Sequence, residues 1–65
     1  MWSITYTKPK ENGYTEILAL FKNIDEARQY IDDRVLGKHV TYDYDNSEKH
    51  IECKLLDGTY YTLIG

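Results

Sequence analysis

The sequence predicts an α+β fold with the element order ββαβββ, in which one helix packs on one face of a single antiparallel sheet of about five strands. Three observations predict this fold. Several stretches alternate apolar and polar residues, which is typical of strands with one buried face. The dipeptides Asn12-Gly13 and Asp57-Gly58 are typical of tight β-hairpin turns. Between the hairpins, residues 24–35 have helical periodicity instead.

The first two strands are expected at residues 2–8 and 14–22. In the first, aromatic and β-branched residues alternate with Ser and Thr, a composition that favours strands. Pro9 cannot donate a hydrogen bond to a neighbouring strand, so it marks a strand end. Asn12-Gly13 then predicts a two-residue turn, because both positions of such a turn need a positive φ.

The helix is expected to begin after Asn23, whose side chain can cap the first turn. Glu26 lies three residues later, in the manner of a capping box. Gly37 supplies the left-handed residue that commonly ends a helix. The apolar stripe of this helix consists of Ile24, Ala27, Ile31 and Val35, with Tyr30 at its edge.

Three further strands are expected after the helix. Residues 39–45 alternate again, the polar segment 45–49 is expected to be a loop, and residues 50–56 form the next strand. The second two-residue turn then leads into a last strand at residues 59–64.

The composition argues against several classes of protein, such as membrane-spanning and secreted proteins. The 65 residues carry eight Lys and Arg against eleven Asp and Glu, a formal net charge of -3, and 42% of them are apolar. We expect residues 1–65 to form a single globular domain. The longest apolar run, residues 17–21, is far shorter than the ~20 residues of a membrane span. The amino-terminus lacks the features of a signal peptide, and a single cysteine cannot form an internal disulfide, so a cytoplasmic location is expected.

Two-residue turns would determine which side chains share a face, because the register of a hairpin follows from its turn. Tyr6 would then lie opposite Ala19, and Leu55 opposite Tyr60. The more apolar face of each hairpin is expected to pack against the helix. In the first hairpin this face carries Trp2, Ile4, Tyr6, Ile17, Ala19 and Phe21, and in the second it carries Ile51, Cys53, Leu55, Tyr60 and Ile64.

One helix can cover only one face of the sheet, so the other face is expected to carry uncovered apolar side chains. They are Leu18, Leu20, Leu56, Tyr61 and Leu63. The solvent side of an antiparallel sheet is usually polar, and contiguous exposed apolar patches tend to mark interaction sites. We therefore expect a homodimer or partner surface on this face. Alternatively, the sheet curls or a β-bulge turns these residues inward and removes the patch.

Tyrosine is abundant, with seven residues in the chain. Tyrosine side chains provide a large contact area and are enriched at interfaces, so Tyr14, Tyr44 and Tyr61 are candidates for a binding surface. The alternative is that tyrosine simply has a high strand propensity.

Acidic residues form a second candidate surface. Such carboxylates could occupy a basic groove on a partner through electrostatic complementarity. The alternative is a solvated surface that keeps a small protein in solution, and basic residues such as Lys54 interrupt the acidic run. The carboxylates are Asp43, Asp45, Glu48, Glu52 and Asp57 in the carboxyl-terminal half, and Asp25, Glu26, Asp32 and Asp33 on the predicted helix.

Metal binding and catalysis lack a recognisable motif. His39, His50 and Cys53 are the only metal-type nitrogen and sulfur ligands, and they do not have the spacing of a zinc site. Cys53 is expected in the core instead. The sequence contains no nucleophile elbow, phosphate-binding glycine loop or H-E-x-x-H motif. We therefore expect a non-enzymatic protein without a metal or a cofactor.

The alternative partner is a nucleic acid. Lys8, Lys10 and Lys22 are placed around the first hairpin, with Tyr14 beside them. Lysines could contact phosphates while the tyrosine ring stacks on a base. The net charge of -3 opposes such binding, so a protein partner is the first expectation.

The order of the elements, with Phe21 just before an Asn23-x-x-Glu26-Ala27 helix start, resembles that of small bacterial and phage domains. In general character, compact, acidic and tyrosine-rich chains are similar to phage-encoded inhibitors of host enzymes. This resemblance implies a protein-binding module, an inhibitor or an adaptor, that docks on a larger protein. The residues expected to bind are the five apolar residues of the uncovered face together with Tyr44, Asp43, Asp45, Glu48 and Glu52.

Overall fold

The computed structural model describes residues 1–45 and 49–65. Within them, five strands and one helix follow one another in the predicted order, and the strand boundaries agree with the prediction to within one residue. The α+β fold class is confirmed. The elements are β1 (Trp2–Lys8), β2 (Tyr14–Phe21), α1 (Ile24–Arg34), β3 (Val40–Asp45), β4 (His50–Leu55) and β5 (Tyr60–Ile64).

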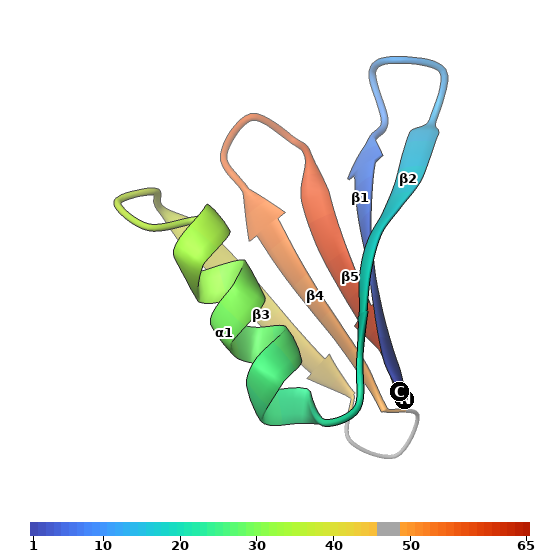
Figure 1. The fold of residues 1–65 in the computed structure, drawn as a ribbon. Coiled ribbons are helices and arrows are strands. Elements are labelled where there is room, and N and C mark those ends of the chain that lie inside the picture. Colours follow the sequence, from blue (N-terminus) through green and yellow to red (C-terminus); the bar gives the residue numbers. More distant parts are fainter. Residues whose placement is uncertain (46–48) are drawn as a thin grey trace.

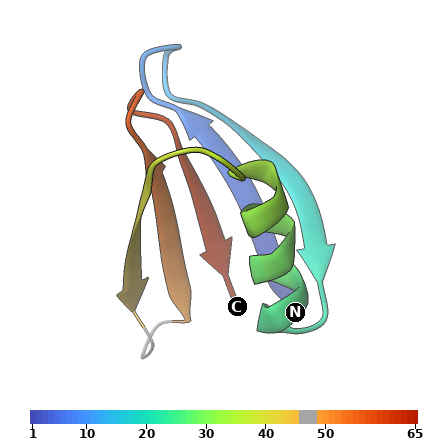
Figure 2. The same cartoon turned by 90° about the vertical axis from the view of Figure 1, so that its left-hand side faces the viewer.

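The strands lie in one antiparallel sheet with the order β2-β1-β5-β4-β3. The first and last strands, β1 and β5, pair with each other, and the two termini lie at the same end of the sheet (Figure 1). The sheet is open, with β2 and β3 at its edges. Figure 2 shows α1 on one face, in front of β1 and β2. We call the opposite face the outer face, and no helix of the described chain covers it.

The first hairpin contains the predicted turn but not the predicted register. Asn12 and Gly13 have φ values of 60° and 69°, as the turn requires. Lys8, however, pairs with Tyr14, where Glu11 was expected. The Glu11 N–H donates to the Lys8 carbonyl at 3.1 Å, so residues 9–11 belong to the loop. The strand ends there because Pro9 has no N–H to contribute to the ladder.

A β-bulge in β2 returns the residues after it to the faces of the sheet on which they were predicted. Thr5 pairs with Ile17 and Ile4 pairs with Ala19, so Leu18 is an extra residue in β2. The bulge considered as an alternative is therefore present. Ala19 faces the helix as predicted, because it pairs with the buried Ile4. Ile17 lies on the outer face, and its predicted place under the helix is wrong.

The second hairpin turns in three residues rather than two. The Leu55 N–H donates to the Thr59 carbonyl at 2.9 Å, and the Gly58 N–H donates to the Leu55 carbonyl at 3.2 Å. Gly58 has a φ of 91°, which glycine adopts without steric cost. The Asp57 carboxylate accepts hydrogen bonds from the N–H and the hydroxyl of Thr59 at 2.9 and 2.6 Å. Three-residue hairpin loops commonly end on such a left-handed residue.

The extra turn residue shifts β5 by one position, which exchanges its two faces. Ile51 pairs with Leu63 rather than with Ile64. Tyr61 and Leu63 therefore lie in the core, with 5% and 1% of their surface exposed. The prediction that these two residues lie on the uncovered face is wrong. The prediction that Tyr60 and Ile64 pack under the helix is wrong for the same reason.

The helix begins as its sequence predicts, but its C-cap lies two residues before the predicted cap, Gly37. The Asn23 side chain accepts a hydrogen bond from the Glu26 N–H at 2.9 Å. The Glu26 carboxylate receives a hydrogen bond from the Asn23 side-chain amide at 3.4 Å, whereas a capping box would use the backbone N–H. Val35 is the C-cap, and Gly37 follows with a φ of 80°. The apolar stripe faces the sheet, because Ala27 and Ile31 are buried.

The core lies between α1 and the sheet. It consists of Ile4, Ala27, Ile31, Val35, Ile51, Cys53, Tyr61 and Leu63. On the β3 side, long polar side chains connect the helix to the sheet. Arg28 donates to the Tyr44 hydroxyl at 3.0 Å, and the Tyr42 hydroxyl donates to Asp32 at 3.1 Å. The space between α1 and β3 is therefore lined by aromatic rings and charged groups.

Candidate functional site

Exposed apolar side chains lie on the outer face at its β2 side. We call them the outer apolar patch: Ile17, Leu20 and Ile64, with 74%, 61% and 48% of their surface exposed. Leu20 and Ile64 both pair with Ser3, one from each side, so they flank it at a separation of about 10 Å. Ile17 is the next outer position of β2, because Leu18 is the bulge residue. The patch stays open because the helix of the described residues lies on the other face.

Hydroxyl side chains occupy the middle of the outer face. Thr5 pairs with Thr62, and Thr7 pairs with Tyr60 on the same side. The hydroxyl of Thr7 lies 3.1 Å from that of Thr15 on β2. A polar surface is usual on the solvent side of an antiparallel sheet, and here the hydroxyls lie between Ile17 and Leu20 on β2 and the charged residues of β3 and β4.

The β3 side of the outer face is acidic, and we call its carboxylates the acidic strip: Asp43, Asp45 and Glu52. Asp43 and Glu52 lie directly opposite each other, a destabilising arrangement for like charges. Lys54 offsets it, because its Nζ lies 2.8 Å from Asp43 and 3.7 Å from Glu52. The hydrogen bond to Asp43 raises the pKa of Lys54. Lys54 therefore offsets part of the negative charge of Asp43 and Glu52.

The predicted apolar surface is only partly present. Leu20 lies on the outer face as expected. Leu56 is 83% exposed, but it belongs to the turn between β4 and β5. Leu18 is half-buried and packs against the core. Tyr61 and Leu63 are buried, so they cannot contribute to a docking surface.

Tyr44 does not lie with the acidic residues of its own strand. It faces the helix side, where its ring stacks on Tyr42 at a centroid distance of 6.0 Å. The Arg28 guanidinium lies 5.5 Å from the centre of the Tyr44 ring. Half of Tyr44 is exposed, so it is accessible from the side opposite to the acidic strip. Glu48, the remaining predicted residue, lies outside the described residues.

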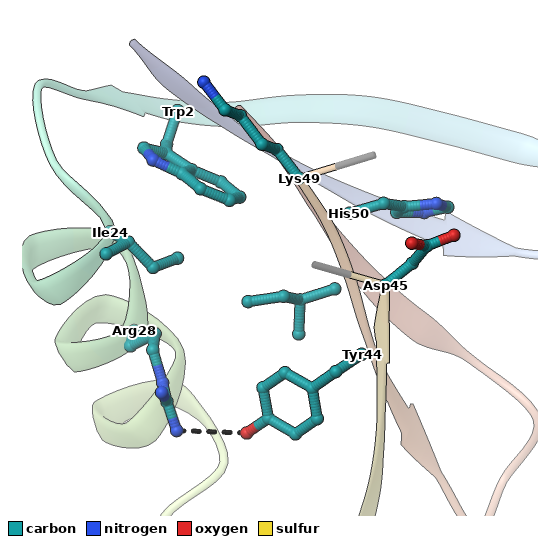
Figure 3. Close-up of a pocket in the computed structure, with 8 residues that line it drawn as sticks. Trp2, Ile24, Arg28, Tyr44, Asp45, Lys49 and His50 are labelled. Atoms are coloured by element: carbon teal, nitrogen blue, oxygen red, sulfur yellow. Dashed lines mark hydrogen bonds between the residues drawn. The ribbon is translucent and has the colours of Figure 1, made fainter. Parts of the chain in front are cut away.

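A pocket of about 440 Å³ lies beside Tyr44, between the first turns of α1 and the end of β3 (Figure 3). The rings of Trp2 and Tyr44 lie on opposite sides of it, with Ile24 and Arg28 along the helix side. The buried Ile51 also lines it. The pocket therefore combines apolar walls with one guanidinium.

The lysines proposed for nucleic acid do not form one cluster. Lys8 stacks over the Tyr14 ring at 5.8 Å, and its Nζ lies 3.8 Å from the Glu11 carboxylate. Lys22 follows the far end of β2, roughly 25 Å from Tyr14 along the strand. Only Lys8 and the loop residue Lys10 remain near the tyrosine, which is too little positive charge to favour a phosphate backbone.

The described residues contain no group of three or more His, Cys, Asp or Glu side chains that could hold a metal ion. Cys53 lies in the core as predicted, and burial raises the pKa of its thiol. No helix within residues 1–45 and 49–65 is long and apolar enough to cross a membrane.

Comparison of the chain with protein-family models, curated proteins and solved structures gives no match. Sequence reasoning missed Ile17 and Ile64, because both exposures follow from shifts of register. Two residues could have indicated these shifts. Pro9 ends β1, which lengthens the first loop. Thr59 hydrogen-bonds to the Asp57 carboxylate within the second turn.

Proposed function

We propose that the chain is a non-enzymatic protein-binding module that docks on a larger protein through its outer face, as an inhibitor or an adaptor. The observation that carries this proposal is the exposure of Ile17 and Leu20 at successive outer positions of one edge strand. Covering each of them would stabilise a complex by roughly 1–2 kcal/mol, given how much of each side chain is exposed. Ile64 extends the same apolar surface toward the centre of the sheet.

The acidic strip specifies the chemistry of the partner. A protein that covers the whole outer face would meet apolar side chains at β2, hydroxyls in the middle and carboxylates at β3 and β4. The complementary surface has an apolar depression bordered on one side by Lys or Arg. Charges at the rim of an interface mainly affect the rate of association and its salt dependence, whereas buried apolar groups provide most of the affinity.

The test is affinity capture from a lysate of the source cell, with the captured proteins identified and their affinities then measured with purified partner. The wild-type chain is compared with the double variant Ile17→Lys/Leu20→Lys and with Asp43→Asn/Glu52→Gln. We expect the first variant to lose the partner. The second is expected to retain it with slower association and a weaker dependence on salt.

Leu36→Lys is the matched control, because Leu36 is an exposed leucine that follows the helix and lies off the outer face. Circular dichroism shows whether each variant is folded. Equal capture by the wild type, the control and the Ile17/Leu20 variant would contradict the proposal. A wild-type homodimer that this variant abolishes would also contradict it, since a second copy would then occupy the patch.

A further inference from the structure

The pocket between α1 and the end of β3 has the size of a small-molecule site. Its volume of about 440 Å³ is within the range of roughly 300–1,000 Å³ that such sites occupy. Sites of this kind combine mainly apolar and aromatic walls with a few polar groups that orient the ligand. It lies on the helix side of the sheet, so it is separate from the proposed docking face.

The walls of the pocket suit a flat apolar group. Trp2 and Tyr44 present rings to it from two different strands, and Ile24 and Ile51 complete the apolar lining (Figure 3). Gly65 lies against the Trp2 indole so closely that a Cβ there would be 2.7 Å from the ring. Gly65 therefore packs closely against the indole, and a preorganised wall lowers the cost of ordering on binding.

The polar end of the pocket offers hydrogen-bond donors. Arg28 has five N–H groups, and one of its terminal nitrogens donates to the Tyr44 hydroxyl at 3.0 Å. Because the hydroxyl oxygen accepts this bond, its own hydrogen is available for a ligand. No carboxylate of the described chain lies within ion-pair distance of Arg28. A guanidinium N–H and a phenol O–H side by side match the two oxygens of a carboxylate.

The other charged residues at the pocket are compatible with an anion. Lys49 contributes a second cation at the rim. Asp45 and His50 also border the pocket, but both side chains point away from it, toward the outer face (Figure 3). Arg28 is therefore the cation that faces the pocket, and the Lys49 ammonium extends past Trp2 at the opposite end (Figure 3). The Asp45 carboxylate does not face an anion bound beside Arg28.

We propose that this pocket binds a small aromatic carboxylate, with its ring between Trp2 and Tyr44 and its carboxylate on Arg28 and the Tyr44 hydroxyl. Lys49 adds long-range attraction. The proposal does not depend on the protein-docking function, because the two sites lie on opposite faces of the sheet.

Trp2 provides the measurement, since it is the only tryptophan of the chain and it lines the pocket. Its fluorescence is followed while the full chain is titrated with benzoate and 3-phenylpropionate, and with 3-phenylpropanamide as the neutral isostere. Backbone amide NMR shifts locate the bound molecule. We expect saturable binding of at least one acid, affinity for 3-phenylpropanamide about tenfold or more below that for 3-phenylpropionate, and shifts at Ile24, Arg28 and Tyr44.

Variants separate this site from non-specific binding. Arg28→Gln is expected to lower the affinity for the acid about tenfold or more, and Tyr44→Phe to lower it several-fold while keeping the ring. Arg34→Gln, which removes the same charge from the last turn of the same helix, is the matched control and should bind like the wild type.

Three outcomes would overturn the proposal. They are the absence of saturable binding by either acid, equal affinities for 3-phenylpropionate and its amide, and unchanged affinity in folded Arg28→Gln. Shifts confined to Ile17 and Leu20 would overturn it as well, because they would place the probe on the outer face. None of these results bears on the capture experiment with the Ile17/Leu20 variant.

Discussion

Tyr42 on β3 donates a hydrogen bond from its hydroxyl to the Asp32 carboxylate of α1, at 3.1 Å. The bond joins the helix to the edge strand β3. The helix itself packs mainly on β1 and β2, toward the other edge of the sheet. Tyr42 also packs against the core, next to the fully buried Cys53 on the neighbouring strand. The Tyr42 side chain therefore links the edge strand to both the helix and the core.

Removing the Tyr42 hydroxyl should lower the free energy of unfolding. We expect Tyr42→Phe to cost about 0.5–1.5 kcal/mol in urea unfolding at neutral pH, the usual value of one hydrogen bond. Tyr60→Phe is the matched control, because within the described chain its hydroxyl makes no hydrogen bond. A Tyr42→Phe variant as stable as that control would show that the bond to Asp32 contributes nothing.

Stability should also depend on the Tyr42 proton at high pH. Burial, together with the neighbouring Cys53 and Asp32, raises the pKa of Tyr42 above its usual value of 10.0. The folded protein then keeps this proton at a pH where the unfolded chain loses it. The contribution is complete below pH 10.0 and is lost as the pH rises toward the folded pKa. Urea unfolding between neutral and alkaline pH should show a shallower decline for Tyr42→Phe than for the wild type, and parallel curves would contradict this.

Two neighbouring residues of β5 test its register. Leu63 is buried, so Leu63→Ala should lower the free energy of unfolding by about 2–5 kcal/mol. Ile64 is half exposed on the outer face, so Ile64→Ala should cost less than about 1 kcal/mol. Thermal and urea unfolding give both values. A larger loss for Ile64→Ala would instead support a two-residue turn at Asp57-Gly58.

The Asp57 carboxylate should titrate at low pH. Its hydrogen bonds from the hydroxyl and the N–H of Thr59 hold the pKa of Asp57 below its usual value of 3.8. Carboxyl-detected NMR should therefore give a midpoint below 3.8. Thr59→Ala removes the hydroxyl and keeps the N–H, so it should move the midpoint part of the way back. The stability that this pairing contributes is present above pH 3.8 and is lost as the pH falls through the folded pKa.

The helix cap should be measurable on its own. Asn23→Ala removes the side-chain acceptor of the Glu26 N–H and should cost about 1 kcal/mol in urea unfolding. Asn23→Asp keeps an acceptor at the same position and should retain most of the stability. Lys22→Ala, one residue earlier and exposed, is the control. Equal losses for Asn23→Ala and Lys22→Ala would contradict the capping role.

Sequence alone could predict the residues of the candidate site only where their face of the sheet does not depend on the register of a hairpin. Leu20 lies on the outer face as predicted. Ile17, Tyr61 and Leu63 do not lie on their predicted faces, because a change of one residue in a turn moves every later side chain to the other face. The pocket beside Arg28 has no signal in the sequence, since it depends on how far the helix extends across the sheet.

The sequence by itself determined the elements, their order and the face of the helix that is buried. These features depend on local physics: the alternation of a strand, the Asn23 cap and the positive φ of Gly37. Tertiary structure decided the pairing of β1 with β5, the bulge at Leu18 and the three-residue turn before Thr59. It thereby decided which apolar side chains remain exposed, because exposure follows from pairing across the whole sheet and no local window contains that information.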